Sequence, residues 1–253
     1  MKIAVVSGAS SGIGREFVKI IDKKCPMLDE IWVIARRRDR LEQLQHHVRR
    51  PLRILEMDMA DRDKLYELKS LMDHKKPQIY VLAASAGFGK YGANETLAFE
   101  DCLGMADVNV TALTALVTMA LPYMVKNSRM LLMASSAAFL PQPGFGIYAA
   151  TKAYVLSYAR SLGQELRRRH IYVTAVCPGP VATEFFAVSG SGGTLAAAKK
   201  LFMAKPRAVA RLAWNDAMAK KNVSVYGLSM KAFRLLAKRL PHRWILKGMG
   251  LFI

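Results

Sequence analysis

The sequence has few acidic residues and few cysteines for its length of 253 residues. It contains 19 Asp and Glu against 38 Lys and Arg, which gives a formal net charge of +19. Its three cysteines, Cys25, Cys102 and Cys177, are widely separated and form no CxxC pair. This pattern argues against a disulfide-rich secreted scaffold and a cysteine-ligated metal, and we expect reduced thiols and no bound metal.

A signal peptide and an uninterrupted membrane-spanning run are also missing. The first apolar run, residues 3–8, is too short for a signal peptide and leads directly into glycines. Two longer uncharged stretches, 108–125 and 130–151, contain proline and polar residues, so we expect neither to span a bilayer. With 52% apolar residues the chain can build a substantial core, and we expect a folded cytoplasmic protein.

Short apolar runs alternate with helical patterns along most of the chain. The runs expected to be strands lie at residues 3–8, 30–37, 53–59, 78–87, 129–136 and 171–179. The longest segments expected to be helical lie at 96–126 and 148–169. This alternation predicts right-handed βαβ units and a parallel sheet covered on both faces. The expected fold is therefore α/β, with a single doubly wound Rossmann-type domain at residues 1–227 and an extension at 228–253.

A glycine-rich loop, SGASSGIG (residues 7–14), follows the first expected strand and opens the first expected helix. Gly8, Gly12 and Gly14 would let the backbone approach a pyrophosphate, and a helix N-terminus offers free N–H groups and the positive end of a dipole. The spacing is G-x-x-x-G-x-G and not G-x-G-x-x-G. A glycine-rich turn without a ligand is the alternative interpretation.

A tyrosine and a lysine stand four residues apart in GIYAATKAY (residues 146–154). On a helix, Tyr148 and Lys152 share one face. A nearby cation lowers a tyrosine pKa from its usual value of about 10, which would assist proton transfer to or from an alcohol oxygen. Taken alone, the pair has a second interpretation, a chance spacing on an exposed helix face.

Together these motifs resemble those of the short-chain dehydrogenase/reductase family, and the similarity extends from the glycine loop to PGPVATEF (residues 178–185). The resemblance implies an oxidoreductase that interconverts a carbonyl and an alcohol by hydride transfer with a nicotinamide cofactor. It also implies a homodimer or homotetramer.

The resemblance assigns four catalytic residues. Tyr148 would be the general acid in reduction and the base in oxidation, and Lys152 would lower its pKa and bind the nicotinamide ribose. Ser135 would hold the substrate oxygen, since it has the family's usual spacing from the tyrosine, while Ser136 is the alternative. Asn109, in DVNVTA, would anchor a water that links the lysine to solvent.

The end of the second expected strand distinguishes NAD from NADP. It reads Ala35-Arg36-Arg37 and has no acid for a ribose hydroxyl, whereas a guanidinium can bind a 2′-phosphate with a bidentate fork. We therefore predict NADP(H), with Arg36 as the main contact and Arg37 or Arg15 assisting. The alternative is a solvated charge run at residues 36–40.

Further cofactor contacts follow from the resemblance. The family's Asn-Ala-Gly is Ser85-Ala86-Gly87 here, which leaves the role of position 85 open. The full predicted set is Gly8, Ser10, Ser11, Gly12, Ile13, Gly14, Arg36, Arg37, Asp58, Met59, Ala86, Gly87, Tyr148, Lys152, Pro178, Gly179, Val181 and Thr183.

Substrate choice in this family comes mainly from the segment after PGPVAT, here a predicted mobile lid at residues 185–207. Its apolar residues suit a lipophilic substrate or, alternatively, pack only on the core; they are Phe185, Phe186, Leu201, Phe202 and Met203. A hydroxysteroid is the next substrate class, followed by a 3-oxoacyl thioester. A non-catalytic NADP-sensing protein is a further alternative, against which the complete Asn-Ser-Tyr-Lys set argues.

The C-terminal third is strongly basic, with thirteen Lys and Arg and one acid in residues 185–253. Residues 228–253 combine a basic amphipathic helical pattern with apolar bulk beyond Pro241. Such a segment can lie on an anionic membrane surface. It can also pack in a homo-oligomer interface, cover the pocket or bind nucleic acid, although no nucleic-acid-binding module accompanies it.

Overall fold

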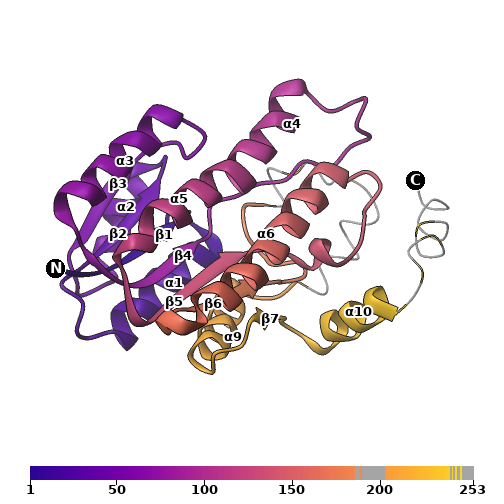
Figure 1. The fold of residues 1–253 in the computed structure, drawn as a ribbon. Helices are drawn as coiled ribbons and strands as arrows, with labels where there is room; N and C mark the ends of the chain where they lie inside the picture. The colour runs from indigo at the N-terminus through magenta and orange to yellow at the C-terminus, as the bar shows by residue number, and fades with distance from the viewer. Residues whose placement is uncertain (186–188, 190–202, 240, 242, 244–245, 247–253) are drawn as a thin grey trace.

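The computed structural model describes residues 1–185, 189, 203–239, 241, 243 and 246. Its centre is a seven-stranded parallel sheet with the strand order β3-β2-β1-β4-β5-β6-β7 (Figure 1). The strands are β1 (Lys2–Ser7), β2 (Glu30–Ala35), β3 (Leu52–Glu56), β4 (Gln78–Ala84), β5 (Met124–Met133), β6 (Tyr172–Val176) and β7 (Val223–Ser224). The predicted α/β fold of the Rossmann type is confirmed.

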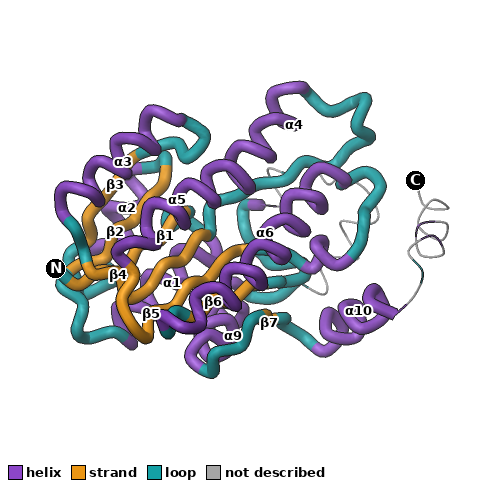
Figure 2. The backbone as a smooth tube through the Cα atoms, in the orientation of Figure 1, coloured by secondary structure: helices purple, strands orange, loops and turns teal. Residues whose placement is uncertain are grey.

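Helices cover both faces of the sheet (Figures 1 and 2). The principal helices in the described residues are α1 (Gly12–Lys24), α2 (Arg38–Gln45), α3 (Arg62–Lys75), α4 (Phe99–Ala106), α5 (Leu113–Ala120), α6 (Gly146–Glu165), α9 (Pro206–Met218) and α10 (Leu228–Arg239). Shorter helical segments are η1 (Asp107–Ala112), η2 (Leu121–Tyr123), η3 (Ser136–Phe139) and η4 (Leu166–Arg169).

The core divides into two layers because successive side chains of a strand point to opposite faces. On β1, Ile3 and Val5 join the cluster that contains residues of α3, α5 and α6, whereas Ala4 and Val6 join the cluster under α1, α2 and α9. Burial on both faces explains why β1, β2 and β4 are nearly continuous apolar runs with no polar alternation.

The strand order reverses beside β1, which pairs with β2 on one side and β4 on the other. The chain therefore leaves β1 and β4 in different directions at the carboxyl edge, which opens a crevice there. In open parallel sheets this switch point is where ligands bind.

Several elements differ from their predicted bounds. The strand expected at 129–136 begins at Met124, and the helix expected at 148–169 begins at Gly146 and ends as the 3₁₀ turn η4. The stretch expected as one or two helices at 96–126 is α4 and α5 joined by η1, a turn of π-helix. Strand β7 and helix α9 were not predicted. Strand β7 has two residues, which are too few to show a pattern, and α9 begins at the end of the predicted lid.

Within the described residues, one helical stretch, Phe99–Tyr123, is long and apolar enough to cross a membrane by length and composition alone. Its α5 part contributes Leu116, Val117 and Ala120 to the core with no exposed surface. A core helix of an α/β domain can have the same length and composition, and the expectation for residues 108–125 stays a prediction.

Replacing Phe17 should test the layer under α1. Phe17 is fully buried between α1 and the sheet, so Phe17→Ala leaves a cavity and should lower the free energy of unfolding by roughly 3–5 kcal/mol. Urea denaturation measures this. Tyr66→Ala on α3 is the control, since Tyr66 is 69% exposed and should change stability by less than about 1 kcal/mol. An equal decrease in the free energy of unfolding in both variants would contradict this account of the core.

Candidate active site

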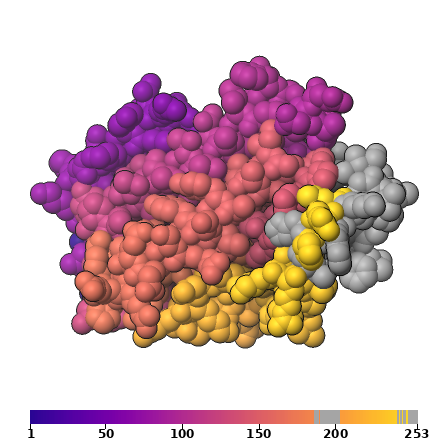
Figure 3. Space-filling model, turned by 45° about the vertical axis from the view of Figure 1, so that its right-hand side comes forward, coloured from indigo at the N-terminus to yellow at the C-terminus, as the bar shows by residue number. Residues whose placement is uncertain are grey.

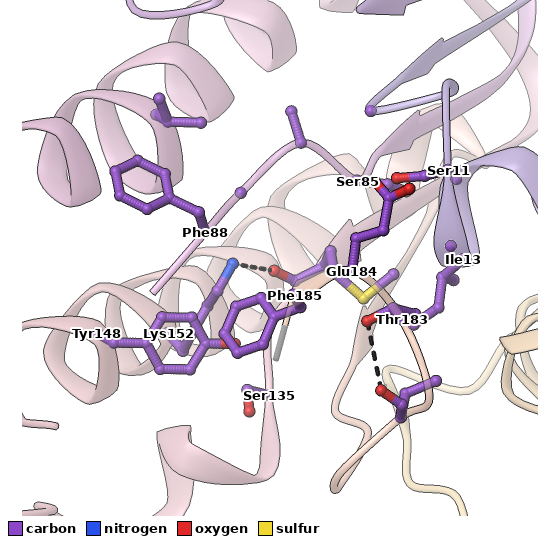
Figure 4. Close-up of a pocket in the computed structure, with 18 of the residues that line it drawn as sticks. Ser11, Ile13, Ser85, Phe88, Ser135, Tyr148, Lys152, Thr183, Glu184 and Phe185 are labelled. Atoms are coloured by element: carbon purple, nitrogen blue, oxygen red, sulfur yellow. Dashed lines mark hydrogen bonds between the residues drawn. The ribbon is translucent and has the colours of Figure 1, made fainter. Parts of the chain in front are cut away.

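A cleft of about 720 Å³ opens at the carboxyl edge of the sheet (Figure 4). Loops after all of the first six strands contribute to its lining. Every residue of the predicted cofactor set lines this cleft, and so do Ser135 and Ser136. Asn109 is fully buried, and Arg15 is not among the lining residues.

The glycine loop lies against the end of β4. Gly8 has φ +67°, and a Cβ there would lie 2.8 Å from the backbone nitrogen of Ala86. A Cβ at Gly14 would lie 2.3 Å from the carbonyl oxygen of Gly8. Helix α1 then begins at Gly12 after an extended Ser11. The loop is therefore a backbone cradle at a helix N-terminus, which is the geometry that binds phosphate groups.

Position 85, whose role the sequence left open, lies beside this cradle. The hydroxyl of Ser7 accepts hydrogen bonds from the backbone N–H groups of Ser85 (3.1 Å) and Ala86 (3.2 Å). The Oγ of Ser85 is buried with no hydrogen-bond partner among the described atoms. A buried polar atom at the wall of the cleft marks a contact for a polar ligand.

Asn109 lies in the π-helical turn η1, a conformation that is rare and frequent at functional sites. Its Nδ2 donates to the carbonyl of Phe88 (2.8 Å) and to Thr151 Oγ1 (3.1 Å), and its Oδ1 accepts from the N–H of Phe88 (3.1 Å). Asn109 thus joins the loop after β4 to helix α6. Its predicted contact with a water stays a prediction.

Tyr148 and Lys152 lie on one face of α6, as the spacing predicts. The Nζ of Lys152 is 5.5 Å from the centroid of the Tyr148 ring and donates to the carbonyl of Met133 at 3.0 Å. Both side chains are buried. Burial lowers the pKa of Lys152 to about 8, from an ordinary value of about 10.5.

The predicted direction of the tyrosine shift is wrong for this structure. Burial raises the pKa of Tyr148 well above its ordinary value, and a hydrogen bond with Ser135 offsets this only in part. The reason is that aromatic rings enclose the phenol while the ammonium of Lys152 is directed at the Met133 carbonyl. Desolvation of the phenolate is therefore the main cause of the raised pKa.

Of the two candidate serines, the geometry favours Ser135. It has extended backbone geometry and caps η3, since its Oγ accepts from the N–H of Ala137 at 3.1 Å, and its side chain also hydrogen-bonds Tyr148. Ser136 donates its backbone N–H to the carbonyl of Pro178 at 2.8 Å. Ser135 is therefore the serine that joins the tyrosine.

An aromatic wall lines the cleft beside the phenol, and the sequence analysis named only one of its added rings, Phe185 of the predicted lid. The rings of Tyr91 and Phe145 stack with centroids 3.8 Å apart, and Phe145 stacks on Tyr148 at 4.3 Å. Phe185 lies on the other side of Tyr148, at 5.3 Å. Phe145 stands three residues before Tyr148, so its contact with the phenol is local, whereas the contribution of Tyr91 depends on the fold.

Charged residues form a second part of the cleft, near the end of β2. Arg36 is well exposed and lies 3.6 Å from Asp58. Arg37 contacts Glu184 at 2.8 Å and the hydroxyl of Ser10 at 3.2 Å, and Arg40 also pairs with Glu184. These pairs lower the pKa of Glu184, chiefly through its hydrogen bond with Arg40. The sequence analysis did not single out Arg40 or Glu184.

The C-terminal helix packs against the back of the site. A Cβ at Gly179 would lie 2.7 Å from the sulfur of Met230 on α10. Phe233 contacts Phe139 of η3, with ring centroids 6.3 Å apart, and Arg234 lies over the same ring at 5.9 Å. One face of α10 therefore packs on the domain of the same chain.

Parts of the predicted lid and tail lie outside the described residues. These are Phe186, Leu201 and Phe202 of the lid, and Leu240, Trp244, Ile245, Leu251, Phe252 and Ile253 of the tail. The end of the predicted lid range, from Pro206, is already part of α9.

Known proteins that resemble this chain point to one family. The profile of the short chain dehydrogenase family matches residues 2–192. The chain belongs to the short-chain dehydrogenase/reductase family. It is therefore an oxidoreductase of that family.

Three similar members show how far the likeness extends. An uncharacterized oxidoreductase of Staphylococcus epidermidis is 30% identical over 185 residues, 72% of this chain and 79% of that protein. A short-chain dehydrogenase from Sphingobium yanoikuyae, solved with NADPH, has a TM-score of 0.79 at 24% identity and covers 100% of this chain and 95% of its own. A member from Burkholderia phymatum, solved with NAD, has a TM-score of 0.79 at 21% identity, with coverage of 93% and 92%.

The burial of Lys152 should appear as a pH dependence of stability. Its folded pKa of about 8 lies below its ordinary value of about 10.5, so between these values the unfolded chain binds more protons and stability rises with pH. Lys152→Met removes this effect. From about pH 7 to about pH 9.5 the stability of the wild type should therefore rise by about 2 kcal/mol relative to Lys152→Met, at 1.36 kcal/mol per pKa unit.

Denaturant unfolding at both pH values measures this difference. The raised pKa of Tyr148 does not interfere, because its stability effect begins only above its ordinary pKa of about 10. A difference between the two proteins that stays constant with pH would show that the lysine keeps its ordinary pKa.

Proposed function

We propose that this chain is an NADP(H)-dependent reductase that interconverts a carbonyl and an alcohol on a lipophilic substrate. One observation carries the proposal. Ser135 and Lys152 lie beside the Tyr148 phenol in one cleft, next to the aromatic wall. The backbone cradle of the glycine loop and the unpartnered hydroxyl of Ser85 fit a dinucleotide in the rest of the cleft.

The side chains divide the work of carbonyl reduction. Ser135 hydrogen-bonds the substrate oxygen, and Tyr148 donates a proton to it as negative charge develops there. Burial keeps the phenol protonated at neutral pH, which suits a general acid. Lys152 places a positive charge close to the phenol and stabilises the phenolate left after transfer. When bound, the nicotinamide supplies the hydride.

The choice of NADP(H) is supported by the residues at the end of β2. Members of this family bind either cofactor, since one solved structure holds NADPH and another NAD. In this chain Arg36 and Arg37 line the cleft where an NAD enzyme has an acid for the ribose hydroxyl. Guanidinium groups at this position favour a 2′-phosphate.

The substrate class follows from the aromatic wall. Tyr91, Phe145 and Phe185 surround the phenol with flat apolar surface, which favours a lipophilic ketone, aldehyde or alcohol over a sugar. A hydroxysteroid is the second choice and a 3-oxoacyl thioester the third. A protein that only senses NADP would not need a proton donor in contact with Ser135.

Tyr148→Phe should abolish turnover without affecting cofactor binding. The variant keeps the ring stack but lacks the transferable proton, so kcat should fall by on the order of 10²–10⁴-fold or more. The measurement is NADPH oxidation against a panel of steroids, fatty aldehydes, quinones, 3-oxoacyl thioesters and sugars, with NADH for comparison. NADPH binding, followed by fluorescence, should be unchanged.

The matched control is Tyr154→Phe on the same helix. Tyr154 is 38% exposed and shares a hydrogen bond of 2.8 Å with Thr114, away from the cleft, so its loss should leave turnover unchanged. Substantial activity in a folded Tyr148→Phe variant would sink the catalytic assignment. Tight NADPH binding with no turnover on any substrate would favour the sensing protein.

We also propose that the outer face of α10 binds an anionic membrane surface. Helix α10 lies at the surface of the molecule (Figure 3). Its inner face packs on the domain through Met230 and Phe233, while Leu228, Leu235 and Leu236 are between 51% and 83% exposed. Exposed lysines and arginines flank these leucines, and residues 217–253 contain no acid. Apolar residues bordered by cations complement an anionic lipid surface.

The double variant Leu235→Gln with Leu236→Gln tests the membrane proposal. The wild type should float with vesicles rich in phosphatidylserine and not with neutral phosphatidylcholine vesicles, and the variant should lose most of this binding. Leu103→Gln on α4 is the control, because Leu103 is equally exposed at 50% but lies outside α10. Failure of the wild type to float with anionic vesicles would end the proposal.

A further inference from the structure

One carboxylate joins two sides of the cleft that are far apart in sequence. Glu184 follows the PGPVAT turn after β6, whereas Arg37 and Arg40 lie where β2 leads into α2. Arg37 Nη1 is 2.8 Å from Glu184 Oε2, and Arg40 Nη1 contacts Oε1. Glu184 lies between the catalytic residues and Ser11 of the glycine loop (Figure 4). The three side chains form an ionic bridge across the cleft.

This bridge occupies guanidinium groups at the position where a 2′-phosphate is recognised. Arg37 is at the end of β2, lines the cleft and also donates to Ser10 of the glycine loop at 3.2 Å. Arg40 joins Arg37 through their shared carboxylate. Arg36, the contact favoured from the sequence, is 77% exposed and paired only loosely with Asp58.

The strengths of the competing interactions decide which partner the arginines prefer. The side chains of Arg37, Arg40 and Glu184 are between 36% and 45% exposed, and ion pairs this open contribute little because water screens them. A phosphate dianion carries twice the charge of a carboxylate and offers three oxygens to the guanidinium fork. The arginines can therefore leave Glu184 for a phosphate at small cost.

We propose that Glu184 and the 2′-phosphate of NADP(H) compete for Arg37 and Arg40, so that Glu184 tunes cofactor affinity from inside the site. This inference rests on the proposed NADP(H) dependence. In this proposal Arg40 is a further phosphate-binding residue. Glu184 is a competitor within the protein, because the phosphate must displace its carboxylate from the two arginines.

The bridge also connects the phosphate end of the cleft with the catalytic end. The next residue, Phe185, lies 5.3 Å from the Tyr148 ring, and its Cζ would be 3.0 Å from a Cβ at Gly89.

The test compares two small ligands by calorimetry on the full-length protein. Adenosine 2′,5′-bisphosphate carries the 2′-phosphate, whereas AMP lacks it. Glu184→Gln should bind the bisphosphate about two- to fivefold more tightly than the wild type does, with AMP affinity unchanged, as expected for the removal of weak exposed ion pairs. Arg40→Gln should weaken the bisphosphate alone.

Glu42→Gln is the matched control. It removes the same charge from α2, but Glu42 pairs with Arg38 at 2.7 Å and not with Arg37 or Arg40. The ratio of bisphosphate affinity to AMP affinity should be the same in Glu42→Gln as in the wild type.

The outcomes separate this inference from the proposed function. If the wild type prefers the bisphosphate but Glu184→Gln leaves the ratio unchanged or lowers it, the competition is refuted and the NADP(H) preference stands. If the wild type does not distinguish the two ligands, the NADP(H) preference itself fails, and the inference fails with it.

Discussion

The contact between the ends of β1 and β4 is the constraint on which the site depends. Ser7 accepts the backbone N–H groups of Ser85 and Ala86, and Gly8 has no side chain to separate the two loops. The glycine loop is thereby fixed beside the chain that leads to Phe88. Asn109 then holds Phe88 and connects it with α6. One line of polar contacts thus connects the glycine loop with the helix that carries Tyr148 and Lys152.

The pattern of the sequence predicted the sheet and most of this line of contacts for a physical reason. Buried parallel strands must be apolar on both faces, and close backbone approach requires glycine at positions such as Gly8, so both leave local signals. The spacing of Tyr148 and Lys152 is likewise a property of one helix. Features that depend on distant contacts left no such signal, as the stacking of Tyr91 on Phe145 beside the phenol illustrates.

The raised pKa of Tyr148 shows that the spacing of two residues in the sequence does not reveal how far they are shielded from water. A neighbouring lysine is visible in the sequence, but the water excluded by Tyr91, Phe145 and Phe185 is a property of the fold. Desolvation acts on both members of the pair in opposite directions, since it raises the pKa of Tyr148 and lowers that of Lys152. Both pKa shifts favour the neutral form of the side chain. Because its pKa is about 8, Lys152 still carries its charge at neutral pH.

The scarcity of acidic residues gives Glu184 its importance. Residues 166–253 contain only two acids, and Asp216 is committed to Lys221 and Ser224 at 2.7 and 2.8 Å, where it ties α9 to β7. Glu184 is thus the acid of this region that faces the cleft. A strongly basic chain attracts phosphate-bearing molecules without selection. On the proposed competition, the Glu184 carboxylate lowers this general attraction and favours a ligand whose phosphate fits both guanidinium groups.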